Sequence, residues 1–229
     1  MSPPVSSVEW LAGFTGIVEL QRYVCYIDGD CSLVVAPAYS DRIKDLDILC
    51  LECPWDQEEL KRRVVAVNPS FYLVPGRAPG ATYKVLWYRS NSYGRRCKVD
   101  LLLPGIMNIP LVSTSTVDYS DPGKPCAPFA LVFLLKLQAW QQHKDSGETR
   151  FRLKAYTDVS DLRRMLPIAR AKGFSIKRTE AYLPSSFVAS ATSRVKRFVQ
   201  ECPDTLRDWK ELGFSVQEER ATWFGFMDY

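Results

Sequence analysis

The sequence predicts an α/β (α+β) protein, with a mixed β-sheet flanked by helices and a helical C-terminal part. In the first half of the chain, short apolar and β-branched runs alternate with turn residues. In the second half, apolar residues recur at helical spacing, beginning with the nearly all-apolar run 129–142. A stretch rich in Ser, Asp, Pro and Gly, 113–128, lies between the two patterns. We therefore expect an α/β core over 1–120 and a helical part over 121–229 that closes a cleft.

Short apolar runs bounded by turn residues predict the strands, because aromatic and β-branched side chains pack well on a pleated surface. The expected strands are 23–27, 46–51, 71–74, 83–88 and 98–103. Helices are predicted where apolar residues recur at helical spacing or where charged helix-forming residues gather. The expected helices are 7–19, 31–35, 55–65, 129–142, 157–172, 186–199 and 204–212. Gly173 is a stop signal directly after the 157–172 helix.

Bulk composition limits the class of protein. A net charge of +4 suits an anionic substrate but is far from the basicity of a histone. The longest uncharged apolar run, Pro125 to Leu135, is too short to span a bilayer, and the N-terminal residues lack the pattern of a secretory signal. The seven cysteines are odd in number and irregularly spaced, which indicates reduced thiols. We expect a cytoplasmic, intracellular protein with no membrane partner.

Three carboxylates set into apolar strands predict a metal site. Asp45 and Asp47 alternate with apolar residues, so both acids are expected on one face of their strand. Asp100 lies in the later apolar run 98–103. Carboxylates crowded together repel each other, and Mg²⁺ or Mn²⁺ with oxygen ligands relieves that repulsion. We expect the three acids to hold such ions beside a polyphosphate; the alternative for Asp45 and Asp47 is an edge strand with one solvated face.

Charged residues of the helical half allow two interpretations each. Lys136 lies within an apolar helix, where its ammonium either faces nucleotide phosphates or snorkels to the surface. Asp158 and Asp161 are three residues apart and share a helix face. We expect Asp158 to cap the N-terminus of its helix, while a positioning role for one of the two acids stays open.

Cysteine and histidine provide little support for a zinc site. Cys50 and Cys53 form a Cys-x-x-Cys pair, but the chain has no second such pair and a single histidine, His143. We expect Cys50 to pack within its strand and His143 to be exposed near a helix end.

These motifs together resemble the nucleotidyltransferase fold, also called polymerase β-like. In particular, the chain resembles small, minimal members of that fold, which include fungal proteins of unassigned role and the nucleotidyltransferase toxins of abortive-infection systems. The shared pattern is a strand, a turn at Asp28-Gly29, a short helix, the Asp45-Leu46-Asp47 strand and the acidic strand with Asp100. The runs 134–140 and 154–162 resemble the lysine helix and the later acidic helix of the toxin-like members. The resemblance covers roughly residues 23–166.

The resemblance implies a metal-dependent transfer of a nucleoside monophosphate from an NTP to a hydroxyl acceptor. It implies Asp45, Asp47 and Asp100 as catalytic ligands of Mg²⁺ or Mn²⁺, and leaves the acceptor open among RNA, a protein and a small molecule. The candidate nucleotide contacts are Gly29, Arg42, Lys136 and Asp161.

The turn before the acidic strand departs from the family pattern. Asp28 stands where the family has glycine, and Asp30 follows Gly29, so two negative charges are expected to repel a triphosphate. This favours the alternative of a non-catalytic relative that binds a nucleotide, RNA or a protein partner. A third alternative is a phosphodiesterase or nuclease that uses the same acids.

Overall fold

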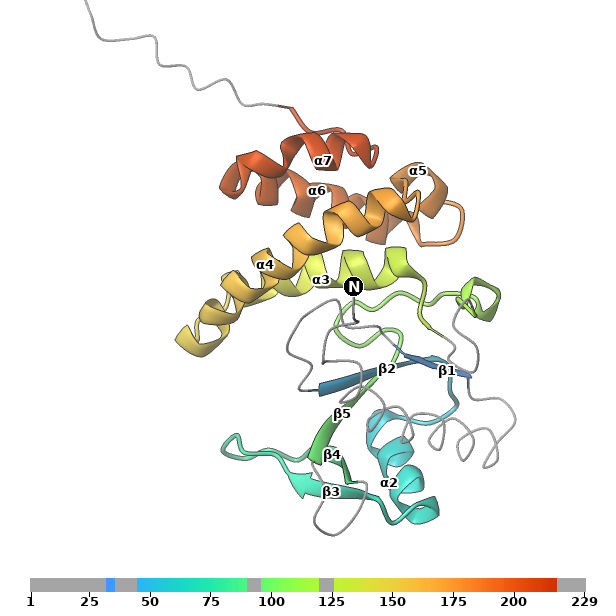
Figure 1. Cartoon of the computed structure of the whole chain (residues 1–229). Helices are drawn as coiled ribbons and strands as arrows, with labels where there is room; N and C mark the ends of the chain where they lie inside the picture. Colours follow the sequence, from blue (N-terminus) through green and yellow to red (C-terminus); the bar gives the residue numbers. More distant parts are fainter. Residues whose placement is uncertain (1–31, 36–44, 90–95, 120–125, 218–229) are drawn as a thin grey trace, which may run out of the picture. The chain divides into compact units, whose positions relative to one another are not determined.

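The computed structural model describes residues 32–35, 45–89, 96–119 and 126–217 (Figure 1). These residues form two compact units. The first unit contains the described residues up to Lys136 together with Ala181–Pro184, and the second contains Leu137–Glu180 and the residues from Ser185 onward. A mixed sheet with flanking helices and a helical C-terminal part is the predicted fold class, which is confirmed. The expected helix 7–19 and strand 23–27 lie outside the described residues.

The first unit contains a five-stranded sheet in the order β1-β2-β5-β4-β3. Its strands are β1 (Ser32–Val35), β2 (Asp45–Glu52), β3 (Phe71–Pro75), β4 (Lys84–Arg89) and β5 (Arg96–Leu102). Strands β2 and β5 run parallel, while the other neighbouring pairs are antiparallel. Four of the expected strands are therefore confirmed with ends within two residues.

The prediction of a short helix at 31–35 is wrong: the described part of this segment, Ser32–Val35, is strand β1. Two successive valines disfavour a helix because β-branched side chains are stiff beside the preceding helical turn. Antiparallel pairing with β2 supplies the hydrogen-bond partners that a four-residue helix would lack at its ends.

Helix α2 (Gln57–Val67) covers one face of the sheet and closes its core. Because strand side chains alternate between faces, every second residue of β2, β4 and β5 points toward this helix. The buried cluster consists of Ile48, Cys50, Leu60, Val64, Phe71, Leu86, Tyr88, Val99, Leu101 and Leu103. Cys50 thus packs within its strand, as predicted. The opposite face of β2 and β5 carries Asp47 and Asp100.

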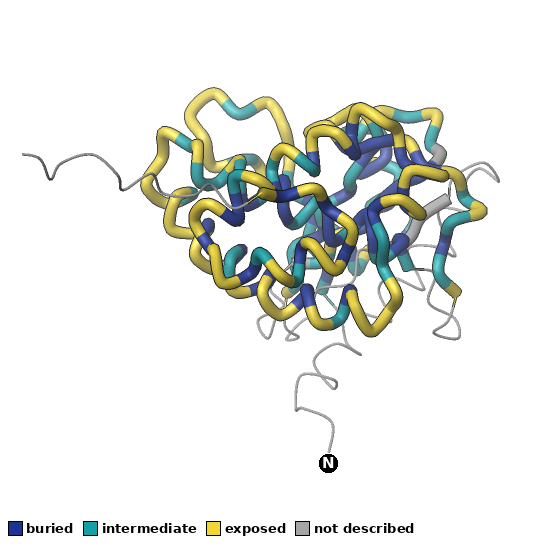
Figure 2. The backbone as a smooth tube through the Cα atoms, turned by 90° about the horizontal axis from the view of Figure 1, so that it is seen from above, coloured by how far each residue is buried: buried dark blue, intermediate teal, exposed yellow. Residues whose placement is uncertain are grey.

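The second unit is helical. It contains the C-terminal half of α3 (Phe129–Lys144) and helices α4 (Thr149–Ala171), α5 (Ile176–Thr179), α6 (Ser185–Glu201) and α7 (Leu206–Glu211). Buried and exposed residues alternate along these helices, as Figure 2 shows. Short 3₁₀ helices lie at Thr114–Thr116 in the first unit and at Pro203–Thr205 in the second.

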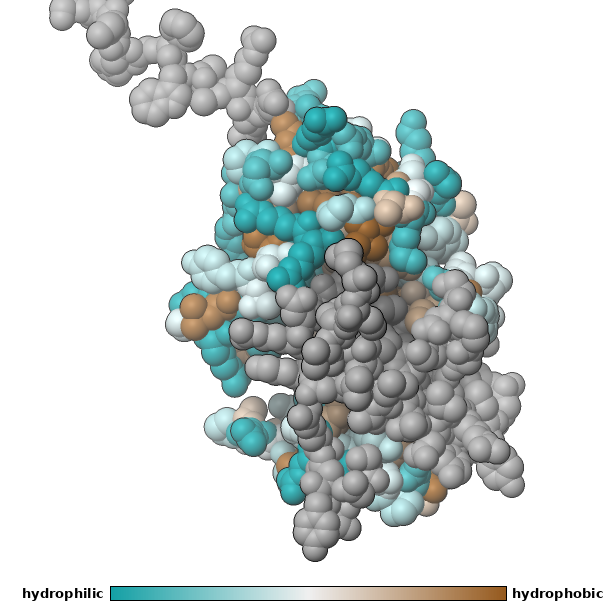
Figure 3. All heavy atoms as spheres, viewed as in Figure 1, coloured by the Kyte–Doolittle hydropathy of each residue, from teal (hydrophilic) through white to brown (hydrophobic). Residues whose placement is uncertain are grey.

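An aromatic cluster joins three helices of this unit. Phe198 of α6 contacts Trp140 of α3 edge-on, with ring centroids 4.9 Å apart, and Trp209 of α7 at 5.9 Å. Trp209 also meets Phe214 at 5.3 Å. Tilted aromatic contacts of this kind add to the stabilisation from buried area alone. On the visible face, most of the described surface of this unit is hydrophilic (Figure 3).

Helix α4 starts eight residues earlier than predicted, at Thr149 instead of Thr157. The added segment contains Arg, Leu, Lys and Ala, all of which favour helix. The C-terminal end is as predicted: Gly173 has a φ of 64°, and its N–H and that of Phe174 donate to the carbonyls of Arg170 and Ala169. This is the Schellman arrangement, in which glycine accepts the left-handed conformation without strain.

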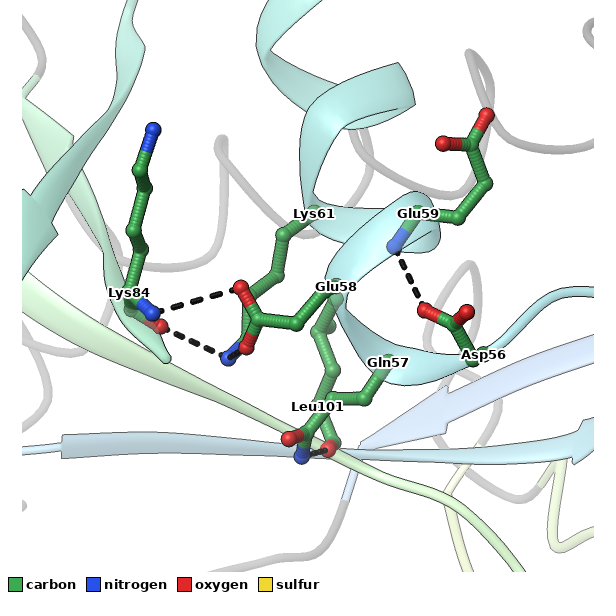
Figure 4. A network of polar contacts seen from close by, with 7 residues as sticks. All are labelled: Asp56, Gln57, Glu58, Glu59, Lys61, Lys84 and Leu101. Carbon is green, nitrogen blue, oxygen red and sulfur yellow. Dashed lines mark hydrogen bonds and ion pairs between the residues drawn. The ribbon is translucent and has the colours of Figure 1, made fainter. Parts of the chain in front are cut away.

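Polar contacts tie α2 to two strands of the sheet (Figure 4). Lys61, only 6% exposed, donates from Nζ to Glu58 Oε1 and to the carbonyl of Lys84, both at 2.7 Å. Glu58 Oε2 accepts from the Lys84 N–H at 3.2 Å. Gln57 Nε2 donates to the Leu101 carbonyl at 2.6 Å. A buried ammonium is tolerated only with such partners, so this network fixes the start of α2 on β4 and β5.

We predict that Lys61→Met destabilises the protein by about 1–3 kcal/mol, because the Lys84 carbonyl loses its buried donor. The measurement is urea unfolding followed by circular dichroism. Arg62→Met is the matched control: Arg62 lies on the same helix, its side chain is 63% exposed, and the expected change is within about 0.5 kcal/mol. Equal stability of the two variants would contradict the role of the network.

Candidate functional site

The two acid-bearing strands are neighbours in the sheet and run parallel. Their register pairs Asp47 with Asp100 and Asp45 with Lys98. Paired residues of adjacent strands point to the same face, and neighbouring strands are about 4.8 Å apart. The structure therefore brings the Asp47 and Asp100 side chains together, on the face opposite the core under α2.

This face changes from polar to apolar along the strands. Asp47 is exposed, whereas Leu49 and Leu51, on the same face of β2, are each only 1% exposed. On β5, half-exposed Asp100 is followed on this face by half-buried Leu102. The two carboxylates thus lie next to the apolar side chains of Leu49, Leu51 and Leu102 on the same face of the sheet.

Asp45 lies two residues before Asp47 in β2. Its backbone pairs with Lys98 of β5, and its side chain is not among those described.

Lys98 places a positive charge within the acidic group. It precedes Asp100 by two residues in β5, so the two side chains share a face, and Lys98 Nζ forms an ion pair with Asp100 Oδ2. About a third of each side chain is exposed, 32% for Lys98 and 35% for Asp100. Solvent therefore screens the pair only partly, and the lysine offsets the charge of a carboxylate that faces another one. Lys98 is not among the site residues that the sequence analysis predicts.

The chemistry of these donors fits a hard divalent cation. Adjacent carboxylates from two strands provide the oxygen ligands that Mg²⁺ and Mn²⁺ prefer, and the ions would relieve the repulsion between them. Among the side chains that the structure describes, no three His, Cys, Asp or Glu residues form a group that could hold a metal. The Asp45 side chain, the expected third ligand, lies outside that set.

The predicted nucleotide contacts fall in different parts of the chain. Gly29 and Arg42, and with them the Asp28–Asp30 turn, lie outside the described residues. Lys136 lies in α3 and is the last residue of that helix within the first unit; its side chain is half-buried. Asp161 belongs to α4 in the second unit and is 4% exposed.

Asp158 and His143 form a pair that the sequence analysis did not predict. Asp158 lies in the middle of α4 and is 4% exposed, so its expected role as N-cap is wrong. His143, expected to be exposed, is instead half-buried in the last turn of α3, with Nδ1 2.6 Å from Asp158 Oδ2. Its ring also stacks on Phe151 at 5.9 Å. A buried carboxylate needs a partner, and this pair joins α3 to α4.

Comparison with models of known protein families gives no match to this chain, and comparison with curated proteins gives none either. Across the described ranges, no helix combines the length and the apolar character that crossing a membrane requires.

We predict that Lys98→Met makes the stability of the protein depend more strongly on divalent metal. Without metal, the free energy of unfolding falls by up to about 1 kcal/mol, since a partly exposed ion pair is removed beside a second carboxylate. Added Mn²⁺ then stabilises the variant more than the parent, because it no longer competes with the ammonium. The measurement is urea unfolding in EDTA and in millimolar MnCl₂.

Lys98→Arg is the matched control for this test, since it keeps the positive charge. It should respond to Mn²⁺ as the parent does. If Mn²⁺ stabilises the parent, Lys98→Met and Lys98→Arg equally, Lys98 does not compete for the site.

Proposed function

We propose that this protein is a metal-dependent nucleotidyltransferase, which moves a nucleoside monophosphate from an NTP to a hydroxyl acceptor. The observation that carries the proposal is the parallel register of β2 and β5, which sets Asp47 opposite Asp100 with Asp45 two residues earlier. The resemblance of the Asp-x-Asp strand and the later acidic strand to the nucleotidyltransferase pattern supports the same reaction.

In this proposal the chain mainly positions its substrates and balances their charge. Asp45, Asp47 and Asp100 would hold Mg²⁺ or Mn²⁺, and Asp100 would also accept the proton of the acceptor hydroxyl. Ions held there would supply the positive charge that neutralises the triphosphate and the departing pyrophosphate. Lys98 offsets the charge of the Asp100 carboxylate. Such positioning and charge compensation account for most of the catalysis in phosphoryl-type transfers.

The remaining assignments belong to the same proposal. The nucleotide contacts in this proposal are Gly29, Arg42 and Lys136, since the expected fourth contact, Asp161, is only 4% exposed. The acceptor is RNA, a protein or a small molecule. We place the reaction in the cytoplasm.

A non-catalytic relative of the same fold is the second candidate. The ion pair between Lys98 and Asp100 favours it, because a carboxylate already neutralised by lysine has less need of a metal. The Asp28-Gly29-Asp30 turn supports it as well, through its charge next to a triphosphate. Calorimetry with NTPs and Mn²⁺ separates the two candidates: binding without release of pyrophosphate favours the non-catalytic relative.

We predict that Asp47→Asn and Asp100→Asn each lower metal-dependent release of pyrophosphate by about a hundredfold or more, because a metal ligand is removed. The assay supplies the four NTPs with Mg²⁺ or Mn²⁺, and unfolding curves check that each variant is folded. Asp204→Asn is the matched control, since Asp204 is an exposed carboxylate of the helical unit that pairs with Arg163. A double variant at Asp47 and Asp100 that is as active as the parent would exclude the proposed site.

A further inference from the structure

The solvent-facing side of α4 carries charge of one sign. The helix contains six basic residues, all of them exposed: Arg150, Arg152, Lys154, Arg163, Arg164 and Arg170. Its two carboxylates, Asp158 and Asp161, are each 4% exposed and face the interior. A solvated helix face usually mixes both signs of charge. The charges that α4 itself presents to solvent are therefore all positive, and a cationic surface suits an anion.

The first turn of α4 has charges that oppose helix formation. Backbone N–H groups give a helix N-terminus partial positive charge, which acidic side chains stabilise and basic ones do not. The first turn of α4 contains no acid but holds Arg150 and Arg152, and Glu148 at the N-cap position makes no side-chain capping bond. Residues that oppose local structural preference are expected where function requires them.

Two cations of this N-terminal half, Arg152 and Lys154, contact neutral partners. Arg152 donates to the carbonyls of Ser146 and Gly147 at 3.0 and 2.8 Å, and to Thr149 Oγ1 at 2.9 Å, so neutral partners hold it in position. Within the part of the chain that the structure describes, no carboxylate lies within ion-pair distance of Arg152 or Lys154.

Arg150 differs from these two, since it pairs with Glu148 at 2.7 Å. The two side chains are 72% and 58% exposed, so water and salt screen the pair strongly. Arg150 therefore still adds to the positive potential of this surface, but less than its neighbours.

Arginines farther along α4 are tied to acids of the fold. Arg163 pairs with Asp204 at 2.9 Å, and Arg170 pairs with Asp208 and Glu211 at 3.0 and 2.9 Å. They attach α4 to the segment 203–211, so their charges already have partners. The cations that remain for an external anion lie in the N-terminal half.

Two large side chains project from this half among the cations. Tyr156 is 76% exposed and Leu153 61% exposed. Arg152 and Tyr156 are four residues apart and share a helix face. We use the term α4 basic surface for the five residues Arg150, Arg152, Leu153, Lys154 and Tyr156.

We propose that the α4 basic surface binds single-stranded nucleic acid. Its cations suit a phosphate chain, and the exposed ring of Tyr156 offers a base a stacking surface, which is how sequence-independent single-strand binding works. Two exposed apolar residues bury too little area for insertion into a membrane. This inference does not rest on the proposed nucleotidyl transfer.

The test uses the full chain and a fluorescein-labelled, U-rich single-stranded RNA, with binding followed by fluorescence anisotropy at several salt concentrations. For Arg152→Gln combined with Lys154→Gln, the slope of log K against log salt should become shallower by about 1.4, since each phosphate that is no longer neutralised accounts for about 0.7. Tyr156→Ala should weaken binding about tenfold and leave the slope unchanged, because stacking releases no counterions.

Arg163→Gln combined with Arg170→Gln is the matched control, since it removes the same charge from the same helix at arginines that already pair with acids. It should leave the slope and the affinity close to those of the parent. DNA of the same sequence distinguishes the kind of nucleic acid, and thermal unfolding checks that each variant folds.

The inference is overturned if the control weakens binding as much as the test variant, since net charge alone would then explain it. It is also overturned if Tyr156→Ala binds like the parent, if RNA does not bind at low salt, or if vesicles with phosphatidylserine bind the chain while RNA does not.

Discussion

The parallel register between β2 and β5 is the constraint on which the candidate site depends. A slip of one residue would move every side chain of a strand to the other face. Such a slip would place Asp47 in the core and expose Ile48, so burial against α2 fixes the register. The proximity of Asp47 and Asp100 is therefore a consequence of apolar packing on the opposite face, and the core stabilises an arrangement that the charges oppose.

Helix α2 holds β4 and β5 in position from the core side of the sheet. Gln57 of α2 holds the carbonyl of Leu101, the residue directly after Asp100, while Lys61 holds the carbonyl of Lys84 on β4. Both bonds fix the strands from the core side. On the acidic side, Lys98 supplies a positive charge next to the two carboxylates. Polar contacts on the core side therefore hold the strands in position, and Lys98 offsets part of the negative charge of the site. Together they keep the two carboxylates adjacent despite their mutual repulsion.

Sequence reasoning predicted the sheet better than the helix contacts, for a physical reason. Alternation of Asp47 with buried Ile48 fixes both strand and face locally, so the acidic pair could be found from one run of residues. Strand β1 could not be predicted from its own residues, because this four-residue segment forms a strand only by pairing with β2. The pair of Asp158 and His143 depends on how α3 and α4 pack, and an acid at helical spacing from apolar residues is the only signal for it in the sequence.

The predicted start of α4 was wrong for a similar reason. Because the helix was expected to begin at Thr157, the basic residues before it were not recognised as part of a helix surface. With a helix expected from Thr157, Asp158 looked like a cap and the cations of 150–154 stood outside any helix. A helix that begins at Thr149 reverses both interpretations: the acids become buried partners, and the cations occupy a turn whose dipole opposes them. Neither the cap nor the dipole explains why the helix begins there, so its stability must come from its apolar face.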